Sequence, residues 1–321
     1  MMKHLIALTT ALCLLSTAYV QSYRDDFSFG NFAPNLRWTW TLPNNNPFCT
    51  LDPTAVSFSS EEGTLQIQMR DGGMFSGFNV HRDVPSLIVQ GTAPADWYIE
   101  TRFRTDWTNI GVFNYVQAGI VIATGADNYF QLLITRDAFN QTNNVYGSTN
   151  LEENDNFEWG ERVSNSWLPT PADEWIGLKI VHNSSVPQIE LYYSSSNTGG
   201  NWVLFDGFNG GIYPEGSRQY NWIQNLISQA GTVRVGVYTD NAGSGQTDTF
   251  EFDYFETNLP VQTRASAGDV NGDGCVDDAD LLAVLFGFGN SGTCLDEDVN
   301  GDGIVDDADL LTVLFEFGTG C

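Results

Sequence analysis

The runs QAGIVIAT, at Gln117–Thr124, and YFQLLITR, at Tyr129–Arg136, decide the fold of the larger part of this chain. Both are short and rich in β-branched and aromatic residues, which suit the pleated surface of a β-strand. Clusters of Gly, Asn, Asp and Ser between such runs are typical of turns. Further runs of this kind are LQIQM (Leu65–Met69), YIETRFRT (Tyr98–Thr105), IGLKIVH (Ile176–His182), IELYYS (Ile189–Ser194), TVRVGVYT (Thr232–Thr239) and TFEFDYFE (Thr249–Glu256).

Many short strands without a βαβ rhythm predict a mainly β fold, an antiparallel β-sandwich over residues 23–258. The segment Gln219–Ala230 fits either a short helix or a loop. Residues 259–267, LPVQTRASA, combine a proline with small residues and no hydrophobic periodicity, so we expect a linker there.

The net charge and the N-terminal residues limit the functions that this chain can have. The 321 residues include 40 acidic and 13 basic ones, and a net charge of -27 argues against binding to nucleic acid or anionic membranes by simple electrostatics. Residues 1–22 carry one early lysine and then an apolar run, which is typical of a secretory signal peptide. No later stretch has the roughly 20 apolar residues of a transmembrane helix. We therefore expect a secreted protein, extracellular or associated with the cell surface.

Cleavage of the signal peptide would leave four cysteines, and an exported chain can pair them in three ways. Three of the four lie near the C-terminus, so a bridge from Cys321 to Cys275 or to Cys294 would fasten the chain end. Cys49 fits a long-range bridge or a buried free thiol equally well.

An acidic motif occurs twice near the C-terminus. GDVNGDGCVDDADLLAVLFGFG spans Gly268–Gly289, and EDVNGDGIVDDADLLTVLFEFG spans Glu297–Gly318, so that Asp298 follows Asp269 by 29 residues. Calcium takes six to eight oxygen ligands, and a 12-residue EF-hand-type loop supplies them from positions 1, 3, 5, 7, 9 and 12. The predicted ligands of two Ca²⁺ ions are Asp269, Asn271, Asp273, the carbonyl of Cys275, Asp277 and Asp280, then Asp298, Asn300, Asp302, the carbonyl of Ile304, Asp306 and Asp309.

Other positions of the repeat agree with this interpretation. Gly274 and Gly303 occupy position 6, where the loop turns sharply, and Val276 and Val305 occupy position 8, from which they can anchor the loop to a core. An apolar helical pattern follows each loop, whereas no entering helix precedes Asp269.

Loop–helix pairs without entering helices resemble type I dockerin modules, here over residues 268–321. The resemblance implies docking onto a cohesin domain of a scaffoldin or cell surface. Recognition positions 10 and 11 are Asp278-Ala279 and Asp307-Ala308, identical in both copies, which would permit two symmetry-related docking orientations. Position 12 is Asp instead of the Glu of regulatory EF-hands, as it often is in dockerins.

The larger part has a resemblance of its own. The phrases DDF (Asp25–Phe27), LRWTW (Leu36–Trp40), PSLIVQ (Pro85–Gln90), QAGIVIAT, DNYFQL, SSSNTGGNW (Ser194–Trp202) and FDYFE (Phe252–Glu256) follow one another in an order that resembles concanavalin A-like jelly-roll domains, the type found at the C-terminus of some β-xylosidases. The resemblance implies a two-sheet sandwich. Such folds include carbohydrate binders and glycosidases, so fold alone does not choose between them.

One motif points towards catalysis. Glu251, Asp253 and Glu256 are similar to the E-x-D-x-x-E strand of laminarinase-type glycoside hydrolases. Glu251 and Asp253 would share a strand face, and a bulge would return Glu256 to it. A retaining glycosidase needs two carboxyl groups roughly 5 Å apart. However, the motif lies on the expected last strand, where Asp253 would instead orient a loop or hold a structural cation with Asp25 or Asp26.

The remaining acidic, histidine and tryptophan residues give weaker evidence for an active site or a sugar-binding site. The acidic stretch LEENDNFEWGE, Leu151–Glu161, fits a solvated loop, and His81 and His182 are isolated. Trp159, Trp167 and Trp222 lie in loop-like surroundings, where their rings would stack on sugars. The other tryptophans that we weighed, Trp38, Trp40, Trp175 and Trp202, lie in strand-like phrases and fit core packing.

The sequence thus predicts a secreted, non-catalytic carbohydrate-recognition protein of polysaccharide degradation, attached through a calcium-binding dockerin to a cohesin or the cell surface. The alternatives are a jelly-roll glycoside hydrolase that uses Glu251 and Glu256, and a structural or adhesion protein.

Overall fold

The computed structural model describes residues 21–28, 30–40, 51–59, 61–70, 83–107, 116–125, 127–136, 145–154, 156–164, 168, 174–241, 245, 247–292, 294–300 and 302–321. The predicted signal peptide lies almost wholly outside the described residues, as do Cys49, His81 and Trp167.

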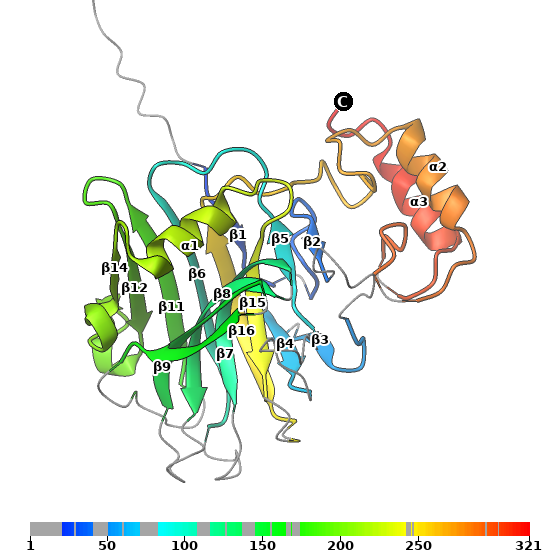
Figure 1. Ribbon diagram of the computed structural model, residues 1–321. Coiled ribbons are helices and arrows are strands. Elements are labelled where there is room, and N and C mark those ends of the chain that lie inside the picture. The colour runs from blue at the N-terminus through cyan, green and yellow to red at the C-terminus, as the bar shows by residue number, and fades with distance from the viewer. Residues whose placement is uncertain are drawn as a thin grey trace, which may run out of the picture.

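In this part of the chain two antiparallel sheets face each other (Figure 1). The first sheet has the order β13-β12-β11-β6-β16-β4-β3, with β1 added to β16 and β14 added to β12, and we call it sheet A. Its strands are β1 (Tyr23–Asp25), β3 (Val56–Ser59), β4 (Thr64–Gln68), β6 (Trp97–Arg104), β11 (Ile176–Asn183), β12 (Gln188–Ser194), β13 (Val203–Leu204), β14 (Ile212–Pro214) and β16 (Thr249–Thr257).

The second sheet has the order β10-β9-β8-β7-β15-β5-β2, and we call it sheet B. Its strands are β2 (Trp38–Thr39), β5 (Ser86–Ile88), β7 (Gln117–Gly125), β8 (Asn128–Arg136), β9 (Val145–Glu153), β10 (Asn156–Arg162) and β15 (Arg234–Asp240). The predicted antiparallel β-sandwich is therefore confirmed, and every run that we interpreted as a strand forms one.

The sandwich core follows from the alternation of side chains along the strands. On β16, Phe250, Phe252 and Phe255 are buried between the sheets, and on β11, Leu178 and Ile180 are buried with them. The residues between them point to the outer face of sheet A, because successive side chains of a strand leave on opposite faces.

The interpretation of LEENDNFEWGE as a solvated loop was wrong. These residues form the end of β9 and most of β10, which pair as an antiparallel hairpin, and the side chain of Glu152 is fully buried. Local composition misled here because Glu and Asn are uncommon in strands, whereas pairing with β8 overrides that preference.

The segment that fitted either a helix or a loop contains the helix α1 (Arg218–Ile227). The Ser217 hydroxyl accepts a hydrogen bond from the backbone N–H of Tyr220, which caps the helix. Two short 3₁₀ helices, Ser196–Thr198 and Phe208–Gly211, complete the helical elements of the described sandwich residues.

The C-terminal repeat forms a small unit with its own core. The helices α2 (Asp278–Gly287) and α3 (Asp307–Glu316) lie side by side (Figure 1). Their shared core consists of Val270, Val276, Val284, Val305 and Val313. The predicted helices and the anchoring role of the position-8 valines are thereby confirmed.

Most of the apolar run on each helix stays at the surface. Phe286 and Phe315 are 85% and 84% exposed. Leu282, Leu285, Phe288, Leu311, Leu314 and Phe317 are exposed as well. Of the two helices, Val284 and Val313 are the residues buried in the shared core.

The first half of the predicted linker is part of the sandwich. Leu259 and Val261 are buried in the main core, and the backbone N–H of Gln262 donates to the carbonyl of Ile88. Arg37 then joins the two units, because its guanidinium donates to the carbonyl of Asn271 at 2.9 Å.

Among the described helices none is both long enough and apolar enough to cross a membrane.

Candidate functional site

The three candidate catalytic carboxylates share the outer face of sheet A. On β16 the pairing with β6 shifts between Phe252 and Tyr254, which marks a bulge. The bulge returns Glu256 to the face that carries Glu251 and Asp253, as we expected.

Each of these carboxylates is held by an arginine. Glu251 forms an ion pair with Arg104 at 2.6 Å and accepts a hydrogen bond from the Gln66 amide at 3.1 Å. Asp253 pairs with Arg102 at 2.5 Å. The face is thus crossed by arginine–carboxylate pairs that fix the orientation of both partners.

Glu256 accepts two further hydrogen bonds, from Arg24 at 2.8 Å and from the Tyr98 hydroxyl at 2.7 Å. Asp25 is buried on the inner face of sheet A, where its carboxylate accepts hydrogen bonds from Phe27 N–H and the Trp38 indole. Asp25 and Asp253 thus lie on opposite faces of sheet A, whereas Asp26, the other predicted partner of Asp253, forms an ion pair with Arg24.

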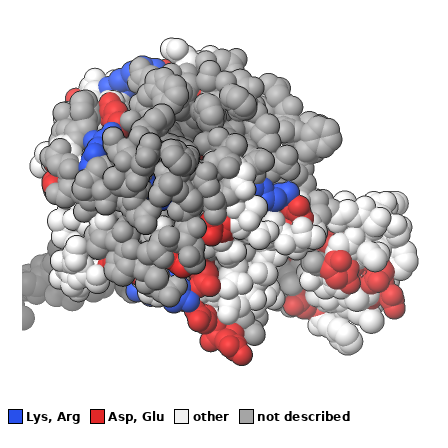
Figure 2. All heavy atoms as spheres, turned by 90° about the horizontal axis from the view of Figure 1, so that it is seen from below, with Lys and Arg blue, Asp and Glu red and all other residues white. Residues whose placement is uncertain are grey.

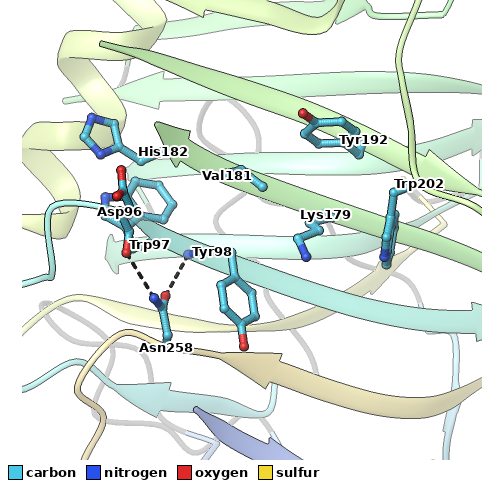
Figure 3. Close-up of a pocket in the computed structure, with 9 residues that line it drawn as sticks. All are labelled: Asp96, Trp97, Tyr98, Lys179, Val181, His182, Tyr192, Trp202 and Asn258. Atoms are coloured by element: carbon cyan, nitrogen blue, oxygen red, sulfur yellow. Dashed lines mark hydrogen bonds between the residues drawn. The ribbon is translucent and has the colours of Figure 1, made fainter. Parts of the chain in front are cut away.

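A hollow of about 350 Å³ lies beside these pairs (Figure 3). Tyr98 from β6, Lys179 from β11, Tyr192 from β12 and Trp202, just before β13, line it. The remaining lining residues are Asp96, Trp97, Val181, His182 and Asn258. The pairing of Lys179 with Tyr192 across the strands places their side chains next to each other on one face.

Lys179 occupies the centre of this set. Its ammonium lies 4.7 Å from the ring centroid of Tyr98 and 5.5 Å from that of Trp202, and it forms an ion pair with Glu100 at 2.6 Å. Cation–π contact and the ion pair together restrain a long side chain that is otherwise flexible. The result is a fixed ammonium donor between two aromatic rings.

The tyrosines remain neutral donors. Burial, with Glu190 accepting its hydrogen bond, raises the pKa of Tyr192 to about 12. Burial and the neighbouring Glu256 carboxylate raise the pKa of Tyr98 well above its ordinary value. The hollow thus offers aromatic faces together with hydroxyl and ammonium donors and carboxylate acceptors.

A second hollow, of about 450 Å³, adjoins the first. It is lined by Arg102, Glu174, Trp175, Ser194, Ser195, Ser196 and Gly200. Glu174 Oε2 and Ser195 Oγ are buried and have no hydrogen-bond partner among the described residues. Buried polar atoms normally have partners, so these two atoms beside the hollow are exceptions.

Of the three tryptophans predicted to contact sugar, Trp222 is the one whose side chain the structure describes. Trp222 lies on α1, is 7% exposed, and its indole N–H donates to the carbonyl of Tyr129 at 3.0 Å. Both ring faces are packed, so its expected role as a sugar platform was wrong. The side chain of Trp159, in β10, and all of Trp167 lie outside the described residues.

Trp202 and Trp175, which we had assigned to the core, are half-exposed. The signal for Trp202 was its position after Gly199 and Gly200 at the beginning of an edge strand, where only one ring face can be covered. His182 is accounted for by packing: it stacks on Trp97, and its ring nitrogens contact the Ala95 carbonyl and the Tyr220 hydroxyl.

In the C-terminal unit, acidic side chains gather at the surface of the two loops (Figure 2). Asp269, Asp280 and Asp309 are fully buried. Asp280 accepts hydrogen bonds from the N–H groups of Asn271 and Asp277, and Asp309 does the same in the second copy. Gly274 and Gly303 have φ of 95° and 90°, a conformation that favours glycine.

The carboxylates of these loops point to backbone N–H groups of their own loop. Within the described residues no three acidic, His or Cys groups converge as a ready cluster for a metal ion. The donor set still suits calcium, because every predicted ligand is an oxygen and a carboxylate oxygen that accepts an N–H keeps a second lone pair.

Cys275 and Cys321 form a disulfide, one of the two pairings that we had left open for the chain end. Cys294 is also disulfide-bonded.

No protein-family profile and no curated protein matches the chain. Among solved structures it is similar to Bacteroides ovatus xyloglucan PUL GH43B, with 16% identity, a TM-score of 0.51, and coverage of 73% of this chain and 38% of that chain. It is also similar to xylan β-1,4-xylosidase from Bacillus halodurans C-125 (17% identity, TM-score 0.49, 73% and 38% covered). An endo-1,3-β-glucanase from Streptomyces sioyaensis has 12% identity, a TM-score of 0.44 and coverage of 73% and 94%.

The match therefore spans about 38% of the length of the Bacteroides and Bacillus chains. At 16% identity, the likeness to the Bacteroides ovatus structure concerns the fold. This chain contains an antiparallel β-sandwich of the jelly-roll type, shared with a GH43 structure.

Proposed function

We propose that the outer face of sheet A binds a polysaccharide or oligosaccharide without cleaving it. The observation that carries the proposal is the hollow in which Lys179 lies between the rings of Tyr98 and Trp202, with Tyr192 beside it. Aromatic faces stack on sugar rings, and a few fixed polar groups select among hydroxyl patterns. The name of the similar Bacteroides ovatus structure, xyloglucan PUL GH43B, is consistent with a role in polysaccharide degradation.

The arginine pairs favour binding over catalysis. A retaining glycosidase requires one carboxylate free to attack and one carboxyl able to donate a proton. Glu251 and Glu256 instead each accept hydrogen bonds from an arginine and from a second donor. A nucleophile in such a network would have to leave it during each reaction cycle.

The test is affinity for a panel of plant and algal polysaccharides, measured in calcium. We expect Trp202→Ala to weaken binding of the preferred glycan at least about tenfold, which corresponds to about 1.4 kcal/mol. Phe286→Ala removes an exposed aromatic ring from the C-terminal unit and serves as the matched control. Equal binding by Trp202→Ala and wild type would exclude this face as the glycan site.

The runner-up is a glycoside hydrolase that uses Glu251 and Glu256. The observation in its favour is that the bulge brings Glu251, Asp253 and Glu256 to one face. Release of reducing ends by the wild type but not by Glu251→Gln would establish it. A third candidate, a structural or adhesion role, would be favoured if the wild type neither cleaved nor bound any glycan of the panel.

The proposal for residues 268–321 is a dockerin-type unit that holds two Ca²⁺ ions through the twelve predicted ligands. The fully buried carboxylates of Asp269, Asp280 and Asp309 support it, because buried charge is costly without a counter-ion. Calcium would supply that counter-charge. Isothermal titration should give two sites in the wild type and one in an Asp280→Ala variant, and unchanged stoichiometry would contradict the assignment.

The same unit would attach the protein to a cohesin-type domain or another cell-surface scaffold after export. The apolar surface of α2 and α3 supports such docking, since Phe286 and Phe315 expose nearly whole rings on the two copies of the repeat. Binding to a cohesin panel in calcium tests this part. Loss of binding in single-copy variants of Asp278-Ala279 or Asp307-Ala308 would contradict two equivalent docking orientations.

A further inference from the structure

A cleft of about 520 Å³ separates the sandwich from the C-terminal unit and shares no lining residue with the hollows on sheet A. Three arginines line it: Arg37 before β2, Arg234 at the beginning of β15, and Arg264 just after the last bridge of the sandwich. The chain has only 13 basic residues against 40 acidic ones. Asp296, Asp298 and Asp302 line the cleft as well, so three guanidinium groups meet three carboxylates there.

Two of these arginines have donors without partners. Arg234 Nε and Nη1 and Arg264 Nε are buried and lack a hydrogen-bond partner among the described residues. A buried donor that bonds neither protein nor water costs free energy, and a buried charge without a counter-ion costs more. Burial lowers the pKa of both guanidinium groups and the charge of Arg37 lowers it further, whereas the Asp296 carboxylate opposes this shift for both.

The carboxylates of the cleft form no hydrogen bond with the unpartnered donors of Arg234 and Arg264 among the described residues. Asp296 pairs with Arg37 at 3.3 Å and is largely exposed. Asp298 accepts a hydrogen bond from Gly303 N–H at 2.7 Å, and Asp302 accepts one from Ile304 N–H at 3.0 Å, both inside their own loop. None of these contacts reaches the open donors of Arg234 and Arg264.

We propose that this cleft binds an oxyanion, a carboxylate, sulfate or phosphate group, through the guanidinium groups of Arg234 and Arg264 that line it. A planar guanidinium presents paired N–H groups that match such oxygens. The half-buried ring of Trp40 and the Gln262 amide also line the cleft, and they suit a sugar that carries the acid group. The oxyanion is either a free inorganic ion or the acid group of an anionic sugar.

The first measurement is calorimetric titration of the unaltered full chain, in calcium and at constant ionic strength set with chloride. The probes are inorganic sulfate, inorganic phosphate, and galacturonate and its oligomers. We expect one site per chain for at least one probe. Binding of sulfate or phosphate would show that a free inorganic ion is enough to occupy the cleft. Binding of galacturonates alone would show that the ligand is an acidic sugar.

Variants then locate the site. Arg264→Gln and Arg234→Gln should each weaken binding at least tenfold. Arg218→Gln, which removes an exposed arginine on α1 outside the cleft, should leave binding unchanged. In the absence of the anion, Arg264→Gln should unfold at the same or a higher temperature than the wild type, because it removes a buried N–H donor that has no partner among the described residues.

Two results would overturn the proposal: no saturable binding of any probe to the wild type, or equal affinities for the wild type and both cleft variants. Neither outcome depends on glycan binding at sheet A, because Trp202→Ala should leave the anion affinity unchanged.

Discussion

The indole of Trp202 lies directly over Gly177. A β-carbon at Gly177 would stand 2.8 Å from Cη2 of Trp202 and 2.4 Å from the Ser194 hydroxyl. Gly177 pairs with Arg102 on one side and Ser194 on the other, and both of these residues line the second hollow. The absence of a side chain on β11 therefore lets Trp202 lie against the sheet between the two hollows.

We expect Gly177→Ala to displace Trp202 and to weaken glycan binding about as much as Trp202→Ala does, roughly tenfold. Affinity measurements on the two single variants and the double variant check this. Because both changes act on one ring, the double variant should be no weaker than Trp202→Ala alone. An additive loss would show that Gly177 acts through another contact.

Trp222→Ala should reduce the stability of the sandwich without changing its glycan affinity. The ring is buried under α1, so its loss should reduce the free energy of unfolding by about 3–5 kcal/mol. Glycan affinity of the folded fraction should stay at the wild-type level. Denaturant unfolding and binding at low temperature measure the two effects, and a selective loss of binding would restore Trp222 as a candidate sugar contact.

The buried carboxyl of Asp25 should give the sandwich a characteristic pH dependence. Burial raises its pKa above the ordinary 3.8, although hydrogen bonds from Ala33, Phe27 and Trp38 oppose the shift. A raised pKa in the folded chain means that the stabilising contribution is complete below pH 3.8 and is lost as the pH rises through the raised value.

The unfolding free energy of the wild type relative to Asp25→Asn should therefore decrease as the pH rises from 3.8, since an asparagine side chain does not titrate. Chemical denaturation at a series of pH values measures this difference. A difference that grows with pH would mean that the three hydrogen bonds outweigh the cost of burial.

The disulfide between Cys275 and Cys321 closes the C-terminal unit, with a sequence separation of 46 residues. Replacing both cysteines by serine should reduce the stability of this unit by about 2–4 kcal/mol, because the unfolded chain gains freedom. Calorimetry in calcium should show a lower transition for residues 268–321 and an unchanged one for the sandwich. Under reducing conditions the C-terminal transitions of variant and wild type should coincide.

Local sequence determined the strands of the sandwich and the two loops of the C-terminal unit. Alternation along runs such as Ile176–His182 and Thr249–Glu256 specifies strands, because a residue that faces the core recurs at every second position. The 29-residue repeat specifies two loops, since Gly274 and Gly303 supply the positive φ that each turn requires and the aspartates at position 9, Asp277 and Asp306, cap the helices that follow.

Tertiary structure decided which of these residues form sites. The first hollow forms only because the strands β6, β11, β12 and β13 are neighbours in sheet A, which brings together Tyr98, Lys179, Tyr192 and Trp202. This strand order depends on pairing between segments that are distant in the sequence. Pairing between distant segments likewise brings Arg37, Arg234 and Arg264 to one cleft. Trp222 had loop-like neighbours in the sequence, yet the docking of α1 onto the sandwich buries it. Local periodicity sets which face a side chain takes, whereas only the packing of remote segments determines whether that face meets core, ligand or solvent.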